Sequence, residues 1–174
     1  YFVKMPGEHQ LKNMTCVIEV CENLRNEFNI SDVDIYNGIS KTTLPARVEV
    51  ICEKPLVILD GGHNEDGAKA FFDAVSPVVK SKNKVIVIAG MMGDKAVEKS
   101  LEPLMKITDV FYAVTPKNPR AMSADELSQI ALKYVKEVHS VDEITNALKN
   151  ACSSLKEDDT LLVVGSLYLA GEIR

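Results

Sequence analysis

A polar cluster follows a short apolar run near the middle of the chain. Residues 55–60 are apolar up to Asp60, as in a strand buried on both faces, and two glycines, His63 and Asn64 come next. Asp60 is well placed to contact a ligand, and the glycines allow a ligand to approach the backbone. His63 and Asn64 would open a helix, where free N–H groups favour anions. Alternatively, Asp60 and Asn64 only cap that helix and His63 is a surface histidine; position alone does not decide.

Two further apolar runs end in turns that contain glycine and polar residues. The run 85–89 leads into GMMGDK, which ends in Asp94 and Lys95 and resembles a phosphate-binding loop only loosely. A turn capped by Asp94 is the favoured interpretation. After the run 160–164, Ser166 can bind a carboxylate or phosphate through its hydroxyl and nearby N–H groups. A helix N-cap explains this serine equally well.

The other candidate binding residues are two arginines in loops and two polar residues near the start of the first predicted helix. Arg47 either contacts a nucleotide or pairs with Glu49, and Arg120 lies in a proline-rich loop. His9 and Asn13 are four residues apart, so they share one face of the predicted first helix. His139, which lies between Val138 and Ser140 in a short extended segment, is interpreted as structural.

Several enzyme signatures are absent from the sequence. G-x-x-x-x-G-K-[ST], G-x-G-x-x-G and G-x-S-x-G do not occur, so neither a Walker loop nor a nucleophile elbow is predicted. No pair of histidines has metal-ligand spacing, and we expect no metal site in this chain. The four cysteines form no C-x-x-C pair and are expected to be reduced and buried; they are Cys16, Cys21, Cys52 and Cys152.

Composition limits the classes of partner. The 174 residues suffice for about one domain with its own core. The formal net charge is −5, whereas nucleic-acid binding needs a clustered basic face, so no nucleic-acid partner is expected. No apolar run approaches the roughly 20 residues of a membrane helix, and no signal peptide is present, so we expect a cytoplasmic protein without a membrane partner. The absence of an initiating Met suggests that the chain begins inside a longer protein.

Apolar periodicity divides the chain into a helical segment and an alternating part. A helix is predicted at 10–28, and a shorter one that Ser31 caps is predicted to end at Gly38. Residues 40–46 are interpreted as a linker. Beyond it, strands are expected at 55–60, 85–89, 109–115, 137–140 and 160–164, and helices at 64–79, 95–107, 123–135 and 140–155. Pro103 is expected to break one helix, and Ser123–Glu126 and Ser140–Glu143 are predicted capping pairs.

Strands that alternate with helices imply right-handed crossovers and a mostly parallel sheet. We therefore predict an α/β fold with three layers over residues 47–174, preceded by a short helical segment at 1–39. In such a sheet, ligands bind beyond the carboxyl ends of the strands, where Asp60, His63 and Ser166 are expected.

Six motifs together point to one family. They are Gly7-Glu8-His9-Gln10 with Asn13, LPARVE at 44–49, LDGGHN at 59–64, GMMGDK at 90–95, Pro119-Arg120, and GSLY at 165–168. In this order they resemble the folylpolyglutamate synthase/dihydrofolate synthase family of the Mur ligases. Ala46 stands where the family has glycine, which makes a left-handed backbone there less easy.

The resemblance implies a Rossmann-like Mur ligase C-terminal domain and an ATP-dependent carbon–nitrogen ligase. Such enzymes use ATP and Mg²⁺ to form an acyl phosphate on a folate or pteroate, and L-glutamate then displaces the phosphate. By position, the resemblance places Asn13, Arg47 and Asp60 at ATP. It places His63 and Ser166 toward L-glutamate, where they converge if their strands are neighbours. Further candidates are His9, Gln10, Asn64, Asp94, Lys95 and Arg120.

The family's phosphate loop, Mg²⁺ ligands and folate site lie in an N-terminal ATPase domain that this sequence lacks. The resemblance thus implies a C-terminal fragment whose residues 1–39 end the central ATPase domain, and which is expected to be inactive alone. Whether the enzyme adds the first glutamate or later ones stays open. Two alternatives also stay open: a Mur-type ligase for cell-wall precursors, and a non-catalytic nucleotide-binding or interaction module.

Overall fold

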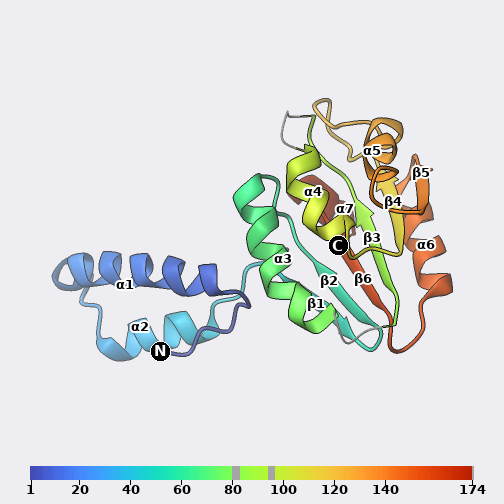
Figure 1. Cartoon of the computed structure of the whole chain (residues 1–174). Coiled ribbons are helices and arrows are strands. Elements are labelled where there is room, and N and C mark those ends of the chain that lie inside the picture. The colour runs from blue at the N-terminus through green and yellow to red at the C-terminus, as the bar shows by residue number, and fades with distance from the viewer. Residues whose placement is uncertain (80–82, 94–96, 174) are drawn as a thin grey trace. The chain divides into compact units, whose positions relative to one another are not determined.

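The computed structural model describes residues 1–79, 83–93 and 97–173, and the chain divides into two compact units, 1–45 and 46–174 (Figure 1). The first unit holds two helices, and the second holds a sheet with helices on both faces. Along the chain the elements are α1 (Glu8–Phe28), α2 (Asp32–Lys41), β1 (Glu49–Glu53), β2 (Leu56–Leu59), α3 (Glu65–Val79), β3 (Val85–Ala89), α4 (Val97–Met105), β4 (Val110–Val114), α5 (Ala124–Ala131), β5 (Glu137–Val141), α6 (Ile144–Ser154), β6 (Thr160–Val164) and α7 (Leu167–Ile173).

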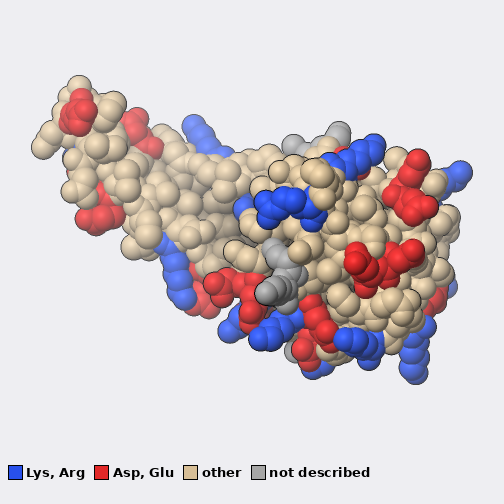
Figure 2. Space-filling view, turned by 90° about the horizontal axis from the view of Figure 1, so that it is seen from above, with Lys and Arg blue, Asp and Glu red and all other residues tan. Residues whose placement is uncertain are grey.

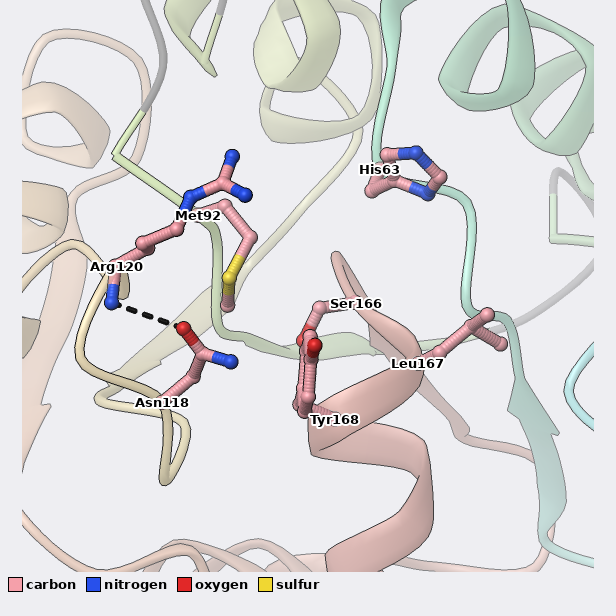
Figure 3. Close-up of a pocket in the computed structure, with 7 residues that line it drawn as sticks. All are labelled: His63, Met92, Asn118, Arg120, Ser166, Leu167 and Tyr168. Carbon is pink, nitrogen blue, oxygen red and sulfur yellow. Dashed lines mark hydrogen bonds between the residues drawn. The ribbon is translucent and has the colours of Figure 1, made fainter.

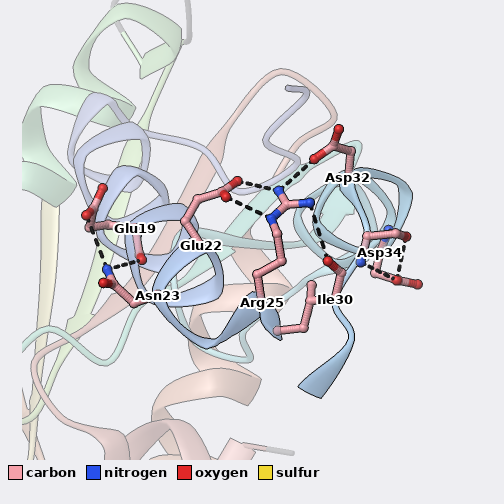
Figure 4. Close-up of polar contacts among 8 residues, drawn as sticks. Glu19, Glu22, Asn23, Arg25, Ile30, Asp32 and Asp34 are labelled. Atoms are coloured by element: carbon pink, nitrogen blue, oxygen red, sulfur yellow. Dashed lines mark hydrogen bonds and ion pairs between the residues drawn. The ribbon is translucent and has the colours of Figure 1, made fainter. Parts of the chain in front are cut away.

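Arg25 links the two helices of the first unit. Its guanidinium donates to Glu22 at 2.8 Å, to Asp32 at 2.6 Å and to the carbonyl of Ile30 at 3.4 Å (Figure 4). The hydrogen bond from Arg25 holds the pKa of the Glu22 carboxyl below its usual range. Beneath this network a small apolar core packs α1 against α2; its buried members are Met5, Met14, Ile35 and Ile39.

The predicted start of α2 is confirmed, but its predicted end is wrong. Ser31 and Asp34 form a reciprocal capping box at the N-terminus. Gly38 lies inside the helix, which continues to Lys41, so Ser40 and Lys41 belong to α2 and not to a linker. Glycine is only mildly unfavourable inside a helix, and here the flanking apolar residues keep packing on α1.

The second unit is built on a six-stranded sheet in the order β1-β2-β6-β3-β4-β5. All neighbouring strands are parallel except β1, which pairs antiparallel with β2. One core cluster packs α3, α4 and α5 on one face, and a second packs α6 and α7 on the other. The predicted three-layer, mostly parallel α/β fold is therefore confirmed, with β1 as an added antiparallel edge.

The expectation that Pro103 breaks its helix is wrong. Pro103 lies within the continuous helix Val97–Met105. It has no N–H to donate to the carbonyl of Lys99, but Lys99 is exposed and water can supply the missing donor. The helix tolerates this loss because Leu101 and Leu104 on its buried face pack into the core.

Of the two capping pairs predicted in the second unit, one is confirmed and the other is wrong. Ser123 and Glu126 form the predicted capping box of α5, although that helix ends at Ala131. Ser140 does not cap α6. It lies in β5 and its hydroxyl donates to Asp125 at 2.6 Å, while α6 begins after Glu143 without a side-chain cap. Tertiary contact with α5 thus replaced the local partner.

The expectation of buried cysteines is wrong. Cys16, Cys52 and Cys152 are exposed and Cys21 is half-buried, and all four are free. The three exposed cysteines lie on outer faces of their elements, whereas Cys21 packs against the small core of the first unit.

Thr160 carries an unsatisfied hydroxyl in the sheet. It is fully buried at the start of β6, and within the described residues its Oγ1 has no hydrogen-bond partner. An unpaired buried hydroxyl costs roughly 1–3 kcal/mol, so Thr160→Val, which keeps the shape, is expected to raise the free energy of unfolding by about 1 kcal/mol. Denaturant unfolding measures this.

Thr108→Val provides the matched control for that measurement. The hydroxyl of buried Thr108 donates to the carbonyl of Leu104 at 2.8 Å, so its removal is expected to destabilise the protein. A loss of stability in both variants would contradict the assignment of Thr160 as unsatisfied.

The surface seen in Figure 2 mixes both signs of charge. Lys and Arg side chains are interspersed with Asp and Glu over this face, rather than gathered into one basic area. No described helix is both long and apolar enough to cross a membrane.

Candidate functional site

A pocket of ≈ 240 Å³ lies at the carboxyl ends of the parallel strands, where an open α/β sheet binds ligands (Figure 3). Its walls come from the segments that follow four strands, β2, β3, β4 and β6. The lining residues are His63, Met92, Asn118, Arg120, Ser166, Leu167 and Tyr168.

The structure brings His63 and Ser166 to the same pocket. The two residues follow β2 and β6, and these strands are parallel neighbours in the sheet. Arg120 joins them from the loop after β4. His63 and Arg120 are exposed, whereas Ser166 is only 1% exposed.

Ser166 is a helix cap as well as a pocket residue. Its Oγ accepts a hydrogen bond from the N–H of Leu169 at 3.0 Å, as an N-cap does. The hydroxyl proton of Ser166 is still available for donation, because the cap uses the oxygen only as an acceptor. The two interpretations of this serine are therefore compatible.

Gly165 fixes the approach of β6 to the neighbouring turn. Its φ is +118°, and a Cβ built there would lie 2.6 Å from the carbonyl oxygen of Gly90 and 2.7 Å from Sδ of Met91. Only glycine suits both that backbone conformation and that contact. This close approach places Ser166 beside the turn that carries Met92.

The loops after β3 and β4 are fastened together. The N–H of Gly93 donates to the carbonyl of Arg120 at 2.8 Å, and Met92 and Ala121 form an antiparallel bridge. From the other side, the N–H of Lys117 donates to the carboxylate of Glu172 in α7 at 2.7 Å. The wall that carries Asn118 and Arg120 is thus fixed at both ends.

Asp60 supports the segment that carries Arg47. One carboxylate oxygen accepts from the N–H of Val48 at 2.8 Å and the other from the N–H of Gly62 at 2.7 Å. Ala46 and Val48 both have left-handed φ values, 53° and 48°, so Ala46 adopts the conformation that is easier for glycine. The hydrogen bond to Asp60 helps to hold this strained turn.

The turn leaves the side chain of Arg47 partly exposed to solvent. Its neighbours Ala46 and Val48 are buried while Arg47 is half-buried, and within the described residues its guanidinium has no ion-pair or hydrogen-bond partner. Glu49, which the sequence offered as a partner, accepts from the N–H of Ala46 at 2.7 Å.

The remaining candidates of the second unit are Asn64, Asp94 and Lys95. Asn64 caps α3, because its Oδ1 accepts from the N–H of Gly67 at 2.8 Å. Asp94 and Lys95 lie outside the described residues.

His9, Gln10 and Asn13 belong to the first unit. Gln10 is buried and its Oε1 accepts from the side-chain amide of Asn13 at 3.1 Å, while Asn13 is exposed and His9 is half-buried. The hydrogen bond orients the Asn13 carboxamide, whose oxygen accepts no hydrogen bond from any of the described residues.

The pocket is rich in hydrogen-bond donors. Arg120 supplies a guanidinium, Asn118 an amide nitrogen and Tyr168 a hydroxyl, and His63 contributes a ring nitrogen. No carboxylate is among the described lining residues, so the pocket favours an anion. Over the described ranges, no group of three His, Cys, Asp or Glu side chains could hold a metal ion.

Sequence reasoning missed four lining residues, Met92, Asn118, Leu167 and Tyr168. Leu167 and Tyr168 stand in the GSLY motif and Met92 in GMMGDK, so their places in the sequence carried a signal. Asn118 precedes Pro119-Arg120, but nothing local showed that its loop folds back onto the turn after β3.

Curated relatives with similar sequences are ligases. The dihydrofolate synthase/folylpolyglutamate synthase of Escherichia coli is 28% identical over 83% of this chain, and the folylpolyglutamate synthase of Lacticaseibacillus casei is 28% identical over 99%. A UDP-N-acetylmuramoyl-L-alanyl-D-glutamate–2,6-diaminopimelate ligase of Helicobacter pylori is 29% identical over 68% of the chain. The chain spans only 33%, 39% and 27% of these three proteins.

Solved structures share the fold. Escherichia coli FolC in complex with DHPP and ADP is 28% identical, with a TM-score of 0.74 over 83% of this chain and 34% of that chain. A bifunctional folylpolyglutamate synthase/dihydrofolate synthase with Mn, AMPPNP and L-glutamate bound has the same identity and coverage and a TM-score of 0.72.

The family model of the Mur ligase glutamate ligase domain matches residues 46–167. The match begins at the first residue of the second compact unit and runs through its sheet to the start of α7. The chain therefore belongs to the Mur ligase family.

Proposed function

We propose that this chain is the C-terminal part of an ATP-dependent ligase that adds L-glutamate to a folate or pteroate. The donor-rich pocket carries the proposal, because it offers cationic and neutral donors to an anion and presents no described carboxylate that would repel one. The relatives named as folylpolyglutamate and dihydrofolate synthases support the substrate class, and the solved relative with L-glutamate bound supports the amino acid.

The reaction we propose has two steps. A carboxylate oxygen of the folate attacks the terminal phosphorus of ATP, ADP leaves, and an acyl phosphate forms. The amine of L-glutamate then attacks the acyl carbon, the bond between that carbon and the phosphate oxygen breaks, phosphate leaves, and the nitrogen loses a proton. The pocket contributes by orienting the amino acid through its carboxylates, which leaves the amine free to react.

On the nucleotide side, we propose that Asn13, Arg47 and Asp60 contact ATP. The guanidinium of Arg47 suits a phosphate, and Asp60 holds the turn that presents Arg47 through its hydrogen bond with the N–H of Val48. Solved relatives with ADP, AMPPNP and Mn support a nucleotide and a divalent metal, and we expect Mg²⁺. Its ligands would come mainly from the N-terminal ATPase domain of the same protein, so this chain alone is expected to be inactive.

The remaining candidates, His9, Gln10, Asn64, Asp94, Lys95 and Arg120, stay predictions of ligand contact. Arg120 is the best supported of them because it lines the pocket. Since ATP is abundant in the cytoplasm, we expect the reaction to take place there.

The glutamate site is tested with His63→Ala and Ser166→Ala in the complete ligase. Loss of a hydrogen bond to a charged ligand costs about 1.5–3 kcal/mol, so each variant should raise the KM for L-glutamate about tenfold or more while the KM for ATP stays constant. Steady-state release of ADP with ATP, Mg²⁺, tetrahydrofolate and L-glutamate measures both constants.

Stability separates the two roles of Ser166. Removing an N-cap costs about 1 kcal/mol, so Ser166→Ala should also lower the melting temperature, whereas exposed His63 should not. If Ser166→Ala lowers the melting temperature and leaves the KM for L-glutamate unchanged, Ser166 is a cap alone.

The Helicobacter pylori relative favours one second candidate, a ligase for cell-wall precursors. Replacing tetrahydrofolate by a UDP-N-acetylmuramoyl peptide in the same assay distinguishes the two. ADP release with the peptide and none with the folate would favour the second candidate.

A further inference from the structure

The backbone that carries Arg47 is strained on both sides of that residue. Ala46 has a φ of 53° and Val48 a φ of 48°, and both values lie in the left-handed region. A residue with a side chain rarely adopts this region, and a β-branched residue such as valine does so only as an outlier. Such a conformation persists only where the surrounding structure holds it, and it is concentrated at functional sites.

Packing holds the two residues that flank Arg47. Ala46 is buried in the core that packs α6 and α7 on one face of the sheet, and Val48 in the core that packs α3, α4 and α5 on the other. Arg47 lies between these two anchors and is half-buried. Glu49 begins β1 opposite Leu59, the last residue of β2, so the turn lies at the same edge of the sheet as the carboxyl end of β2.

Three hydrogen bonds fasten the same turn. The N–H of Ala46 donates to Oε2 of Glu49 at 2.7 Å, and its carbonyl accepts from the N–H of Gly61 at 2.8 Å. The N–H of Val48 donates to Oδ2 of Asp60 at 2.8 Å. Asp60 is buried at the end of β2, whereas Glu49 is half-buried, so Glu49 can be replaced with less disturbance of the core.

The hydrogen bond from Ala46 also decides what the Glu49 carboxylate does. An ion pair between Glu49 and Arg47 would withdraw the guanidinium from a ligand. Instead, Oε2 of Glu49 is engaged by a backbone N–H, and the guanidinium of Arg47 has no ion-pair partner within the described residues. The carboxylate therefore holds the backbone of the turn, not the side chain that the turn presents.

We propose that Glu49 is a positioning residue for nucleotide binding, which acts through Arg47 by holding the left-handed turn in place. The proposal rests on the function proposed above and goes beyond it, since it assigns a role to a residue that does not itself touch the nucleotide. A carboxylate only accepts hydrogen bonds and repels a phosphate, so Glu49 can assist binding only indirectly. A guanidinium binds phosphate through N–H groups in a rigid fork, and this contact needs a fixed backbone beneath it.

Glu49→Ala in the complete ligase tests the proposal through the binding of AMPPNP with Mg²⁺, measured by titration calorimetry. Loss of the acceptor loosens the turn, so the Kd for AMPPNP is expected to rise about tenfold or more. Glu49→Gln keeps an oxygen that can accept from the N–H of Ala46, so its Kd should stay within about threefold of the original value. Glu53→Ala is the matched control, because it removes an exposed carboxylate from the other end of β1 and should leave the Kd unchanged.

A double-mutant cycle shows whether Glu49 acts through Arg47. If it does, Glu49→Ala weakens AMPPNP binding in the original ligase but has no further effect in the Arg47→Ala background, where no guanidinium is left to position. A merely structural role would weaken binding by the same factor in both backgrounds, and that result would overturn the proposal. A Kd in Glu49→Gln as high as in Glu49→Ala would also overturn it, because the charge and not the hydrogen bond would then be what matters.

These binding ratios are independent of the reaction itself. If the ligase binds AMPPNP but releases no ADP with tetrahydrofolate and L-glutamate, the proposed function fails while the cycle still decides the role of Glu49. If Arg47→Ala leaves the Kd unchanged, the proposal for Glu49 fails, while the glutamate site proposed at His63 and Ser166 is unaffected. A ligase that binds no AMPPNP would overturn both the proposed function and the role of Glu49.

Discussion

Replacing Gly165 by alanine is expected to lower the free energy of unfolding by roughly 2–5 kcal/mol. A left-handed φ costs a side-chain-bearing residue about 1–3 kcal/mol, and forcing a methyl group into packed structure adds about 1–3 kcal/mol. Both terms apply here, because φ is +118° and the new Cβ would lie 2.6 Å from a backbone oxygen of Gly90, which cannot rotate away. Thermal and denaturant unfolding of the chain measure the loss.

Gly171→Ala is the matched control in the same unit. Gly171 lies inside α7, and a Cβ there would meet nothing within 4 Å. Alanine is favoured over glycine in a helix by about 1 kcal/mol, so this variant should be as stable as the original protein or more stable. Equal losses in both variants would show that the contact between Gly165 and Gly90 does not limit stability.

The second large effect is expected at Arg47. If its guanidinium binds a phosphate of ATP, Arg47→Ala in the complete ligase removes a charge-assisted contact worth about 1.5–3 kcal/mol. The kcat/KM for ATP should then fall about tenfold to hundredfold, with little change in melting temperature, because Arg47 has no partner within the described residues. Steady-state kinetics at varied ATP measures the change.

Two further variants sharpen the test of Arg47. Arg47→Lys keeps the charge but not the planar fork, so its kcat/KM should lie between the original enzyme and Arg47→Ala. Lys106→Ala removes an exposed cation that pairs with Glu102 in α4, and it should leave ATP kinetics unchanged. Unchanged ATP kinetics in Arg47→Ala would show that Arg47 is a surface residue that does not contact ATP.

Local signals in the sequence predicted much of the fold. The runs at 85–89 and 160–164 became β3 and β6 without a change of boundary, because continuous apolar residues suit strands buried on both faces. The capping boxes at Ser31 and Ser123 formed because each uses partners three residues away. These features depend on residues that are close together in the chain, so they can be recognised from the sequence alone.

Signals that compete with distant contacts were less reliable. Ser140 has the spacing of a cap but bonds to Asp125, fifteen residues away, and Gly38 continues a helix that packing on α1 sustains. Cysteine composition favoured burial, but exposure depends on which face of an element meets the core, and Cys16, Cys52 and Cys152 lie on outer faces.

By itself, the sequence determined the alternation of strands and helices and the polar residues at the strand ends, since both follow from local periodicity and turn chemistry. Tertiary structure decided which of those ends meet. The strand order sets β6 between β2 and β3, so Ser166 lies beside the segments that carry His63 and Met92. It also folded the loop of Asn118 back onto the turn after β3 through hydrogen bonds between residues almost thirty positions apart. Strand order depends on how helices bury the whole sheet, and no short stretch of sequence contains that information.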